Sequence, residues 1–281
     1  MTDQNIKQNI EHYDQVYAKL NIVNIINSVN NPEWFLAKNA TRETSWHGLY
    51  QAGFIDAIKG RNVLELGCGD GLNALLMAKL GANVVALDIS EASKIVIEKA
   101  NETLKLPVTA ITGDFLGIDF RLQTFDIVVG KDFLHHLTYE REEAYLRKIA
   151  TLLKPNGEAR FTEPAVNSKF LDALRWIIPV PGRPSKLNKA AFREWKKHDP
   201  HPERENSTRH FRDVGSRYFS SVDIIMLGSI ERFHRIIPPG KFNDKFRRWS
   251  HRLELNLPQW FRHYAARSQA IIYKYPKKEN E

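Results

Sequence analysis

The sequence alternates between apolar runs and amphipathic stretches from residue 61 onward. The runs, such as RNVLEL and ANVVALDI, are apolar at most positions, whereas the stretches between them, such as GLNALLMAKL, repeat apolar residues at helical spacing. A strand that is apolar on both sides is buried on both faces, which is typical of a parallel sheet covered by helices. The pattern therefore predicts an α/β fold with a doubly wound, mostly parallel sheet.

The chain divides into four segments where this alternation starts and stops. Residues 61–164 carry it and are expected to form the core. Residues 1–60 are predicted to be helices rich in aromatic residues, which we expect to form a cap or lid over the strand ends, where such sheets bind ligands. Residues 165–218 combine prolines, basic residues and helical periodicity, and they predict a substrate-side insertion after the fifth strand. Residues 219–281 contain SSVDIIML and SQAIIYKY, which we expect to be the final strands of the same sheet.

The composition is that of a globular protein. Of the 281 residues, 42% are hydrophobic and 11% aromatic, which is enough to bury a large core. No stretch approaches the roughly 18 uninterrupted apolar residues of a membrane span. The polar start MTDQNIKQNIEHYDQ does not resemble a secretory signal, and a single cysteine cannot form an internal disulfide. We therefore expect a cytoplasmic protein.

The net charge of +8 is unevenly distributed along the chain. Residues 1–164 carry 17 basic and 21 acidic side chains (net −4), whereas residues 165–281 carry 24 basic and 12 acidic side chains (net +12). Such a basic half is compatible with nucleic acid, an anionic membrane surface, an acidic substrate or a solvated face. The charge alone leaves these alternatives open, including peripheral contact with a membrane.

A glycine-rich turn, VLELGCGDG at residues 63–71, follows the first apolar run directly. Its glycines, Gly67, Gly69 and Gly71, let backbone N–H groups and the start of the next helix approach a negatively charged ligand atom. A dinucleotide-binding fingerprint would have its third glycine at the position of Leu72. The turn predicts a nucleotide-like ligand, and its spacing departs from the dinucleotide pattern.

The same turn, ELGCGDG with Glu65 two residues before the first glycine, resembles the first motif of class I S-adenosylmethionine-dependent methyltransferases. Further segments agree in the family's order, namely VALDIS, TGDF, FDIVVGKDFLHHL and LLKPNGEARF. Asn156 replaces the first glycine of the family's L-L-K-P-G-G turn, a mild departure because asparagine tolerates a left-handed backbone. The resemblance covers residues 61–163. It implies a Rossmann-like fold, with S-adenosylmethionine as cofactor and S-adenosylhomocysteine as product.

The resemblance also implies which residues hold this cofactor. Glu65 would hold the methionine amino group, and Asp88, about 20 residues past the glycines, would accept hydrogen bonds from the ribose hydroxyls. Asp114 would contact the exocyclic nitrogen of the adenine, with Phe115 against the ring. Cys68 is interpreted as a small filling residue and not as a nucleophile. The full predicted set is Glu65, Gly67, Gly69, Gly71, Asp88, Ile89, Asp114, Phe115 and Gly130, and no metal site is expected.

Three functions fit these features: a small-molecule methyltransferase, a nucleic-acid methyltransferase, and a nucleotide-binding module that has lost catalysis. Base-modifying members of the family often carry an N/D-P-P-Y/F tetrad at the end of the fourth strand, where this chain has Gly130-Lys131-Asp132-Phe133. The basic C-terminal part matches no nucleic-acid module, and the cofactor positions are intact. We therefore predict a small-molecule methyltransferase without a specific nucleic-acid partner, with an RNA methyltransferase as the weaker alternative.

The acceptor chemistry is predicted from the segment DFLHHL after the fourth strand. Histidine titrates near neutrality, so we predict a hydroxyl acceptor that loses its proton to His136, with Glu163 orienting the imidazole or the acceptor. Transfer to nitrogen or carbon stays open, and so does a structural role in which the histidines cap the following helix. The residues predicted to bind the acceptor are Tyr13, Tyr17, Trp46, His135 and Arg212.

The end of the insertion gives a hint about the acceptor, because basic residues crowd there. An acidic or phosphorylated acceptor would match them, although surface salt bridges would produce the same pattern. The residues concerned are His201, Arg204, Arg209, His210, Arg212 and Arg217.

Overall fold

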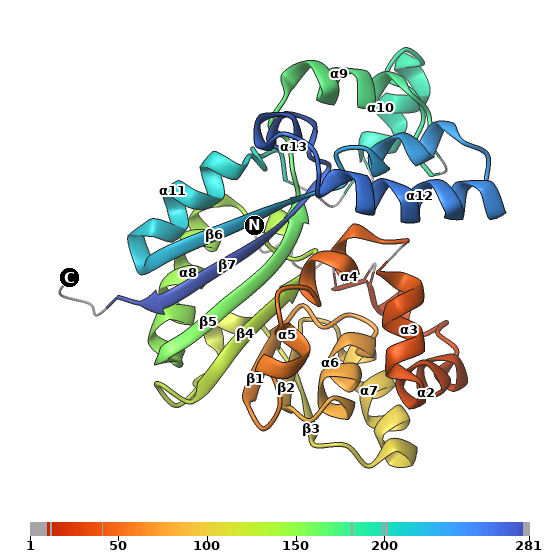
Figure 1. Cartoon of the computed structure of the whole chain (residues 1–281). Helices are drawn as coiled ribbons and strands as arrows, with labels where there is room; N and C mark the ends of the chain where they lie inside the picture. Colours follow the sequence, from red (N-terminus) through yellow and green to blue (C-terminus); the bar gives the residue numbers. More distant parts are fainter. Residues whose placement is uncertain are drawn as a thin grey trace.

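The computed structural model describes residues 10–11, 13–40, 42–180, 182–197, 199 and 202–277. The strands within these ranges are β1 (Asn62–Leu66), β2 (Asn83–Asp88), β3 (Val108–Thr112), β4 (Phe125–Lys131), β5 (Leu153–Pro164), β6 (Phe219–Leu227) and β7 (Ser268–Pro276). They form one seven-stranded sheet with the order β3-β2-β1-β4-β5-β7-β6 (Figure 1). Strands β1 to β5 pair in parallel, and β7 pairs antiparallel with both β5 and β6. The predicted α/β, Rossmann-like fold is confirmed.

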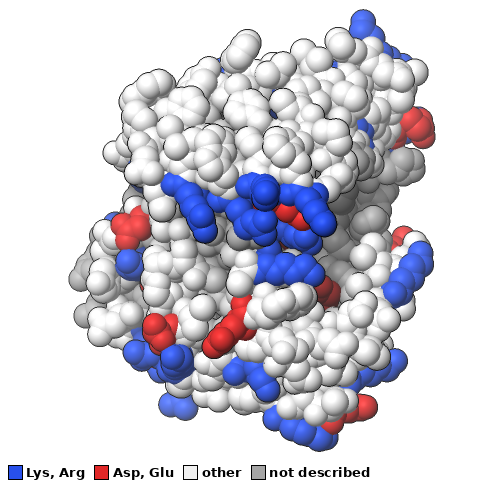
Figure 2. Space-filling model, turned by 45° about the vertical axis from the view of Figure 1, so that its right-hand side comes forward, with Lys and Arg blue, Asp and Glu red and all other residues white. Residues whose placement is uncertain are grey.

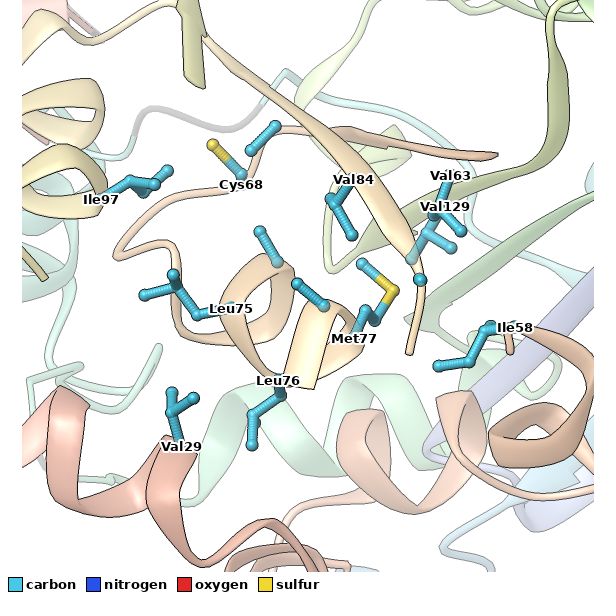
Figure 3. Packing of buried hydrophobic residues seen from close by; sticks show 14 of the residues in the cluster. Val29, Ile58, Val63, Cys68, Leu75, Leu76, Met77, Val84, Ile97 and Val129 are labelled. Atoms are coloured by element: carbon cyan, nitrogen blue, oxygen red, sulfur yellow. The ribbon is translucent and has the colours of Figure 1, made fainter. Parts of the chain in front are cut away.

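Helices cover both faces of this sheet, because its central strands are apolar on both sides. The covering helices are α6 (Leu72–Lys79) and α7 (Glu91–Leu104) on one face, and α8 (Tyr139–Leu152) and α11 (Thr208–Tyr218) on the other, while α2 (Ile22–Asn30) packs on α6 and α7. Each face of the sheet has its own hydrophobic core, and neighbouring residues of β1 point to opposite faces. Val63 packs in the core beneath α6 and α7, and Leu64 and Leu66 pack in the core beneath α8 and α11. Figure 3 shows Val63, Val84 and Val129 of three strands beside Leu75, Leu76 and Met77 of α6.

Side-chain caps fix where two of the covering helices begin. The Ser90 hydroxyl accepts a hydrogen bond from the backbone N–H of Ser93 at 3.3 Å and starts α7 directly after β2. Thr138 caps α8 in the same way, through the N–H of Arg141 at 3.4 Å. Residues 89–90 thus connect β2 to α7, and residues 132–138 connect β4 to α8. Both connections lie at the ligand end of the sheet.

Most of the N-terminal segment packs on the body of the fold. Its further helices are α3 (Pro32–Asn39), α4 (Thr44–Leu49) and α5 (Phe54–Ala57). α2 contacts α6 and α7 and buries Ile25 and Val29, and α4 lies against β5 and β7. Tyr13 and Tyr17, from a helical stretch at residues 13–17, reach the strand ends. A cap or lid formed by residues 1–60 stays a prediction. Tyr13 and Tyr17 are the residues of this segment that we also predicted to bind the acceptor and that line the cavity at the strand ends. Residues 1–9, 12 and 41 lie outside the described part of the chain.

Two helical excursions leave the sheet from the same edge, where β5 and β6 end. The first contains α9 (Lys169–Ile177) and α10 (Lys189–Lys197), and the second, between β6 and β7, contains η3 (Glu231–Ile236), α12 (Lys241–Glu254) and α13 (Gln259–Ala265). They gather at the top of Figure 1, beyond the strand ends. We predicted the first excursion but not the second, since residues 219–281 were expected to supply only strands. Two further short turns complete the order, η1 (Phe115–Gly117) and η2 (Leu134–His136).

Some of the basic side chains form a band on one face of the molecule. Figure 2 shows Lys and Arg side chains in a band across the middle of one face, in the hollow between its upper and lower halves. Within the described ranges, no helix has the length and apolar content needed to cross a membrane.

Candidate active site

A cavity of about 450 Å³ opens at the carboxyl ends of β1, β2 and β4. The strand order reverses here, since β2 and β4 flank β1 and their helices cover opposite faces, and such a switch point is where these sheets bind ligands. The predicted residues that line the cavity are Tyr13, Tyr17, Glu65, Gly67, Gly69, Asp88, Ile89, Asp114, Phe115 and His136. Those that do not line it are Trp46, Gly71, Gly130, His135, Glu163 and Arg212.

Two glycines of the turn have different tasks. Gly67 and Gly71 both have a left-handed backbone, with φ of +64° and +72°. A Cβ atom at Gly67 would lie 2.4 Å from the ring of Phe133, which lines the cavity. At Gly71 it would lie 2.1 Å from Ile97 of α7, in the core. Gly67 thus shapes the cavity, whereas Gly71, predicted as a cofactor contact, permits close packing of α6 on α7.

Glu65, at the end of β1, places a buried carboxyl group in the cavity wall. Its side chain is 1% exposed, and its Oε1 accepts a hydrogen bond from the Asn73 amide at 2.6 Å. Its Oε2 is buried and has no hydrogen-bond partner among the described residues. Burial raises the pKa of Glu65 to about 8. A carboxyl group with one unsatisfied oxygen fits the amino group of S-adenosylmethionine, which would supply both a donor and a positive charge.

Asp88, at the end of β2, holds the glycine turn in place. Its Oδ2 accepts a hydrogen bond from the backbone N–H of Gly69 at 2.8 Å, and its Oδ1 accepts one from Ser90 at 3.0 Å. Burial raises the pKa of this carboxyl group, and the backbone N–H donors oppose that shift. Each carboxylate oxygen has a second acceptor site, so Asp88 can still receive hydroxyl groups from the cavity.

Asp114 closes another side of the cavity together with two residues of α8. Its Oδ1 accepts hydrogen bonds from the Arg141 guanidinium at 2.6 Å and from the Tyr145 hydroxyl at 3.1 Å. Although burial opposes ionisation, the Arg141 hydrogen bond and charge lower the pKa of Asp114. Phe115, 2% exposed, follows it and packs on Tyr145 with ring centroids 4.8 Å apart. This arrangement provides an ionised acceptor beside a flat aromatic wall.

His136 and two tyrosines, Tyr13 and Tyr17, line another part of the cavity. The rings of Tyr13 and Tyr17 stack with centroids 5.6 Å apart, and His136 meets Tyr13 edge-on at 6.2 Å. Burial and the nearby Asp88 raise the pKa of both tyrosines, so both are neutral at physiological pH. The structure thus brings an imidazole and two aromatic faces together over the glycine turn.

Glu163 lies elsewhere than predicted. It is fully buried, and its Oε1 accepts backbone hydrogen bonds from Phe133 at 3.0 Å and Leu134 at 2.6 Å. Its Oε2 meets the ring Nδ1 of His135 at 2.6 Å. Glu163 therefore orients His135, and not His136, and it fixes the turn η2 from behind the cavity. His135, predicted to bind the acceptor, points into the same buried pair.

Three other predicted contacts also have different places. Gly130 packs against Phe161, where a Cβ atom would lie 2.6 Å from the ring. Trp46 belongs to α4, is 5% exposed in the hydrophobic core, and stacks on Tyr50. Arg212 is exposed on α11, whose other side packs on β6 and α8. The sequence could not distinguish these positions, because the side of an element that a residue faces depends on tertiary packing.

The other basic residues at the end of the insertion serve mainly structural ion pairs. Arg204 and His210 both contact Glu142, each at 2.7 Å, and Arg204 also donates to the carbonyls of Leu134 and Leu137. Two surface pairs join Arg209 to Asp213 and Arg217 to Glu143. His201 lies outside the described residues. The alternative of salt bridges is thus the one that the structure shows for these residues.

Sequence reasoning missed several residues of the cavity wall. Asn73 links Glu65 to the hydroxyl of Tyr50, which donates to the Asn73 Oδ1 at 2.7 Å. Arg141 and Tyr145 of α8 reach Asp114 from a helix that the pattern shows only as amphipathic. Their spacing of four residues places both on one helix face, but nothing in the sequence indicates which loop that face meets.

Known proteins share part of this chain. Residues 63–157 match a family described as a methyltransferase domain. The chain is 43% identical over 112 residues to the cypemycin N-terminal methyltransferase of Streptomyces sp. The aligned part is 38% of this chain and 44% of that protein. It is 31% identical over 121 residues to the ubiquinone biosynthesis O-methyltransferase of Coxiella burnetii, covering 43% and 50%. The chain thus spans about half the length of the curated relatives it matches.

Solved structures agree in fold. A phosphoethanolamine N-methyltransferase of Haemonchus contortus, solved with S-adenosylhomocysteine, has a TM-score of 0.53 at 16% identity and covers 79% of this chain and 52% of that one. A putative methyltransferase of Haloferax volcanii, solved with its activator Trm112, has a TM-score of 0.54 at 15% identity and covers 97% and 99%. At such identity these structures support the fold alone. The match of residues 63–157 shows that this chain carries a methyltransferase domain, and the sheet order and the glycine-turn cavity agree with it.

Proposed function

We propose that this protein transfers the methyl group of S-adenosylmethionine to a small-molecule acceptor, and that the acceptor atom is a hydroxyl oxygen. The observation that carries the proposal is the cavity at the switch point, where a buried carboxyl oxygen of Glu65 has no partner within the described chain. The curated relatives support methyl transfer. One is named for N-terminal methylation and another for O-methylation, so they leave the acceptor atom to be decided by the site.

The chain's own residues would bind and orient the cofactor. Glu65 would accept hydrogen bonds from its amino group, and Asp88 would accept them from its ribose hydroxyls. Asp114, beside Phe115, would accept one from the adenine amino group. When bound, S-adenosylmethionine supplies an electrophilic methyl group on a sulfonium centre. The neutral rings of Tyr13 and Tyr17 cover this part of the cavity, and aromatic faces attract a cation. They also exclude water from the path of the methyl group.

On the acceptor side, His136 holds the position of a base. Methyl transfer depends mainly on alignment, but a hydroxyl reacts faster if it loses its proton as the new bond forms. His136 lines the cavity beside Tyr13, so an acceptor bound in the cavity next to these rings would place its hydroxyl within reach of the imidazole. Transfer to an amine is the runner-up, favoured by the higher identity to the N-terminal methyltransferase.

Calorimetry of S-adenosylmethionine binding tests the proposal. Asp88→Ala should weaken binding by about 1–3 kcal/mol, because ribose hydroxyls lose a charged acceptor and the glycine turn loses its anchor. Asp213→Ala is the matched control, since Asp213 is an exposed carboxylate that pairs with Arg209 on α11. Equal affinity of wild type and Asp88→Ala would remove Asp88 from the site, and a preference for a nicotinamide dinucleotide would overturn the whole proposal.

A further inference from the structure

A second cavity, of about 190 Å³, lies at the same edge of the sheet as the first. Its walls come from the chain that follows β5, from α9, and from η3 and residues 266–268 of the second excursion. The two helical excursions thus meet around it, although they lie about 60 residues apart in the sequence. Asp132, after β4, lines both cavities, so the second cavity adjoins the cofactor site.

The charge of this cavity is positive. Its wall contains four guanidinium groups and two carboxylates, and counting Glu231, which pairs with Arg267, leaves a formal excess of one positive charge. The guanidinium groups belong to Arg175, Arg232, Arg235 and Arg267, and the carboxylates to Asp132 and Asp172. Lining cations of one sign in a partly desolvated hollow attract an anion of matching charge.

These arginines differ in how well the protein satisfies them. Arg267 is neutralised, because it pairs with the buried Glu231 at 2.6 Å. Arg232 donates to the carbonyl of Ala265 at 2.8 Å, and no carboxylate lies within ion-pair distance of Arg232 or Arg235 in the described chain. Arg175 forms a long ion pair with Asp172 at 3.9 Å, and its Nε is buried without an acceptor among the described residues. The cavity therefore presents guanidinium donors that no described protein group uses.

The arginines also repel one another. Burial, together with the neighbouring cations of Arg267 and Arg175, lowers the pKa of Arg235 to about 10. Arg232 is shifted in the same direction by burial and by the same two cations. Arginine stays protonated at neutral pH even so, and a bound anion would relieve the repulsion. The wall also contains polar residues, among them Asn167 and Ser168, and a group of apolar side chains, namely Leu171, Leu174, Ile178, Val180, Phe233 and Ile236.

We propose that the second cavity binds the phosphate group of an organic phosphate monoester with an apolar body, held by Arg232, Arg235 and Arg175. A monoester carries about −1.5 to −2 charges at neutral pH and three acceptor oxygens, which suits a positively charged wall with unused guanidinium donors. This inference rests on the proposed function, because it makes the monoester the methyl acceptor. The apolar body contacts the wall of leucines and Phe233, and the reacting end passes Asp132 into the first cavity.

Hexyl phosphate, a soluble monoester, is the probe in a phosphate-free buffer, with binding followed by thermal shift and calorimetry. Hexyl phosphate should raise the melting temperature of the wild type, and Arg235→Gln should weaken its binding by about 10-fold to 100-fold, the usual range for losing a charged hydrogen bond. Arg235→Lys should restore part of the affinity by restoring the charge. Arg209→Gln is the matched control, because Arg209 is 88% exposed on α11.

Further probes separate the sources of the phosphate. Weaker binding of inorganic phosphate than of hexyl phosphate supports the monoester, and equal binding of the two overturns it. An equal rise in melting temperature with hexyltrimethylammonium would also overturn the proposal, since it would show that only the apolar chain of the probe is recognised. Binding to phosphatidic acid vesicles without binding of soluble hexyl phosphate would assign recognition to a membrane surface and overturn the cavity site.

Affinity for S-adenosylhomocysteine, measured on the same proteins, separates this inference from the proposed function. It should be equal in the wild type and in Arg235→Gln, because Arg235 does not line the first cavity. Failure of the wild type to bind S-adenosylhomocysteine would overturn the proposed function. Normal binding of S-adenosylhomocysteine without binding of hexyl phosphate would overturn this inference alone.

Discussion

Glu65 shows how strongly the fold changes the chemistry of one side chain. Its carboxyl group is buried at the end of β1, and burial raises its pKa to about 8 from an ordinary value of 4.5. Between these two values the empty folded protein keeps a proton that the unfolded chain has lost. The contribution of Glu65 to the free energy of unfolding therefore falls as the pH rises through this range. A bound amino group would reverse the shift by favouring the carboxylate.

Binding of S-adenosylmethionine at pH 7 should therefore release a proton from Glu65. Calorimetry in HEPES and in Tris, which differ in ionisation enthalpy, measures this proton as a buffer-dependent heat. Glu65→Gln should bind more weakly and show no such dependence, because glutamine does not titrate. Asp213→Asn, an exposed carboxylate on α11, should behave as the wild type. Buffer-independent heats in the wild type would contradict the role of Glu65.

His136 is the residue on which the oxygen chemistry depends. His136→Ala should lower kcat by about 10²–10⁴ and leave cofactor affinity unchanged, because a base acts in the transition state and not in cofactor binding. Turnover of the identified acceptor and calorimetry with S-adenosylhomocysteine give the two readouts. His263→Ala on the exposed side of α13 is the control. If His136→Ala keeps the wild-type kcat from about pH 6 to 9, alignment alone carries the reaction.

Helices and strands hold the two cavities through buried carboxylates. Glu163 of β5 fixes the turn η2, which carries His136, by accepting its backbone N–H groups. Glu231 holds the second excursion together through ion pairs. It contacts Arg247 of α12 at 2.8 Å and Arg267, which precedes β7, at 2.6 Å. Burial opposes ionisation of Glu231, but the hydrogen bond from His234 and the charge of Arg267 lower its pKa to about 2.

Glu231→Gln should therefore destabilise the protein by about 3–5 kcal/mol at pH 7, because two buried arginine contacts lose their counter-charge. The lowered pKa sets the pH dependence: the stabilisation is complete above about 4.5 and is lost as the pH falls toward about 2. Urea unfolding at pH 7 and at lower pH measures both effects, with Asp213→Asn as the exposed control. A difference between variant and wild type that stays constant down to pH 3 would contradict this assignment of the pKa.

Across the whole molecule, part of the basic charge of the C-terminal half is used within the fold. Arg204, Arg247 and Arg267 pair with buried glutamates, and other arginines line the second cavity. Figure 2 nevertheless shows a band of exposed Lys and Arg on one face. This distribution fits weak attraction to polyanions better than a specific nucleic-acid interface, which would need base or shape contacts in addition to charge.

RNA should accordingly bind only weakly and without specificity, with retention lost near physiological salt. A filter-binding titration across salt concentrations tests this, because the slope of the logarithm of the affinity against that of the salt counts the phosphates neutralised. A homopolymer and a structured RNA should behave alike. Tight binding of the structured RNA that persists at high salt would contradict the small-molecule acceptor and favour an RNA methyltransferase.

The sequence by itself determined the sheet, the glycine turn and the ends of its strands. Local apolar patterning fixes which runs become buried strands, and a parallel sheet brings their carboxyl ends to one edge, so Glu65, Asp88 and Asp114 were predicted to lie there, and the structure brings them together in one cavity. His136 follows β4 by few enough residues to reach the same edge.

Only the tertiary structure decided which neighbouring side chains face that edge. Glu163 and His135 turned into the interior, and Arg204 and His210 turned toward Glu142, because burying a charge requires a partner that the sequence does not identify. The second cavity arises in the same way. Its arginines come from two excursions that are distant in the sequence and meet because β5, β7 and β6 are neighbours in the sheet. Contacts between such distant segments depend on strand order, and strand order is a property of the folded chain as a whole.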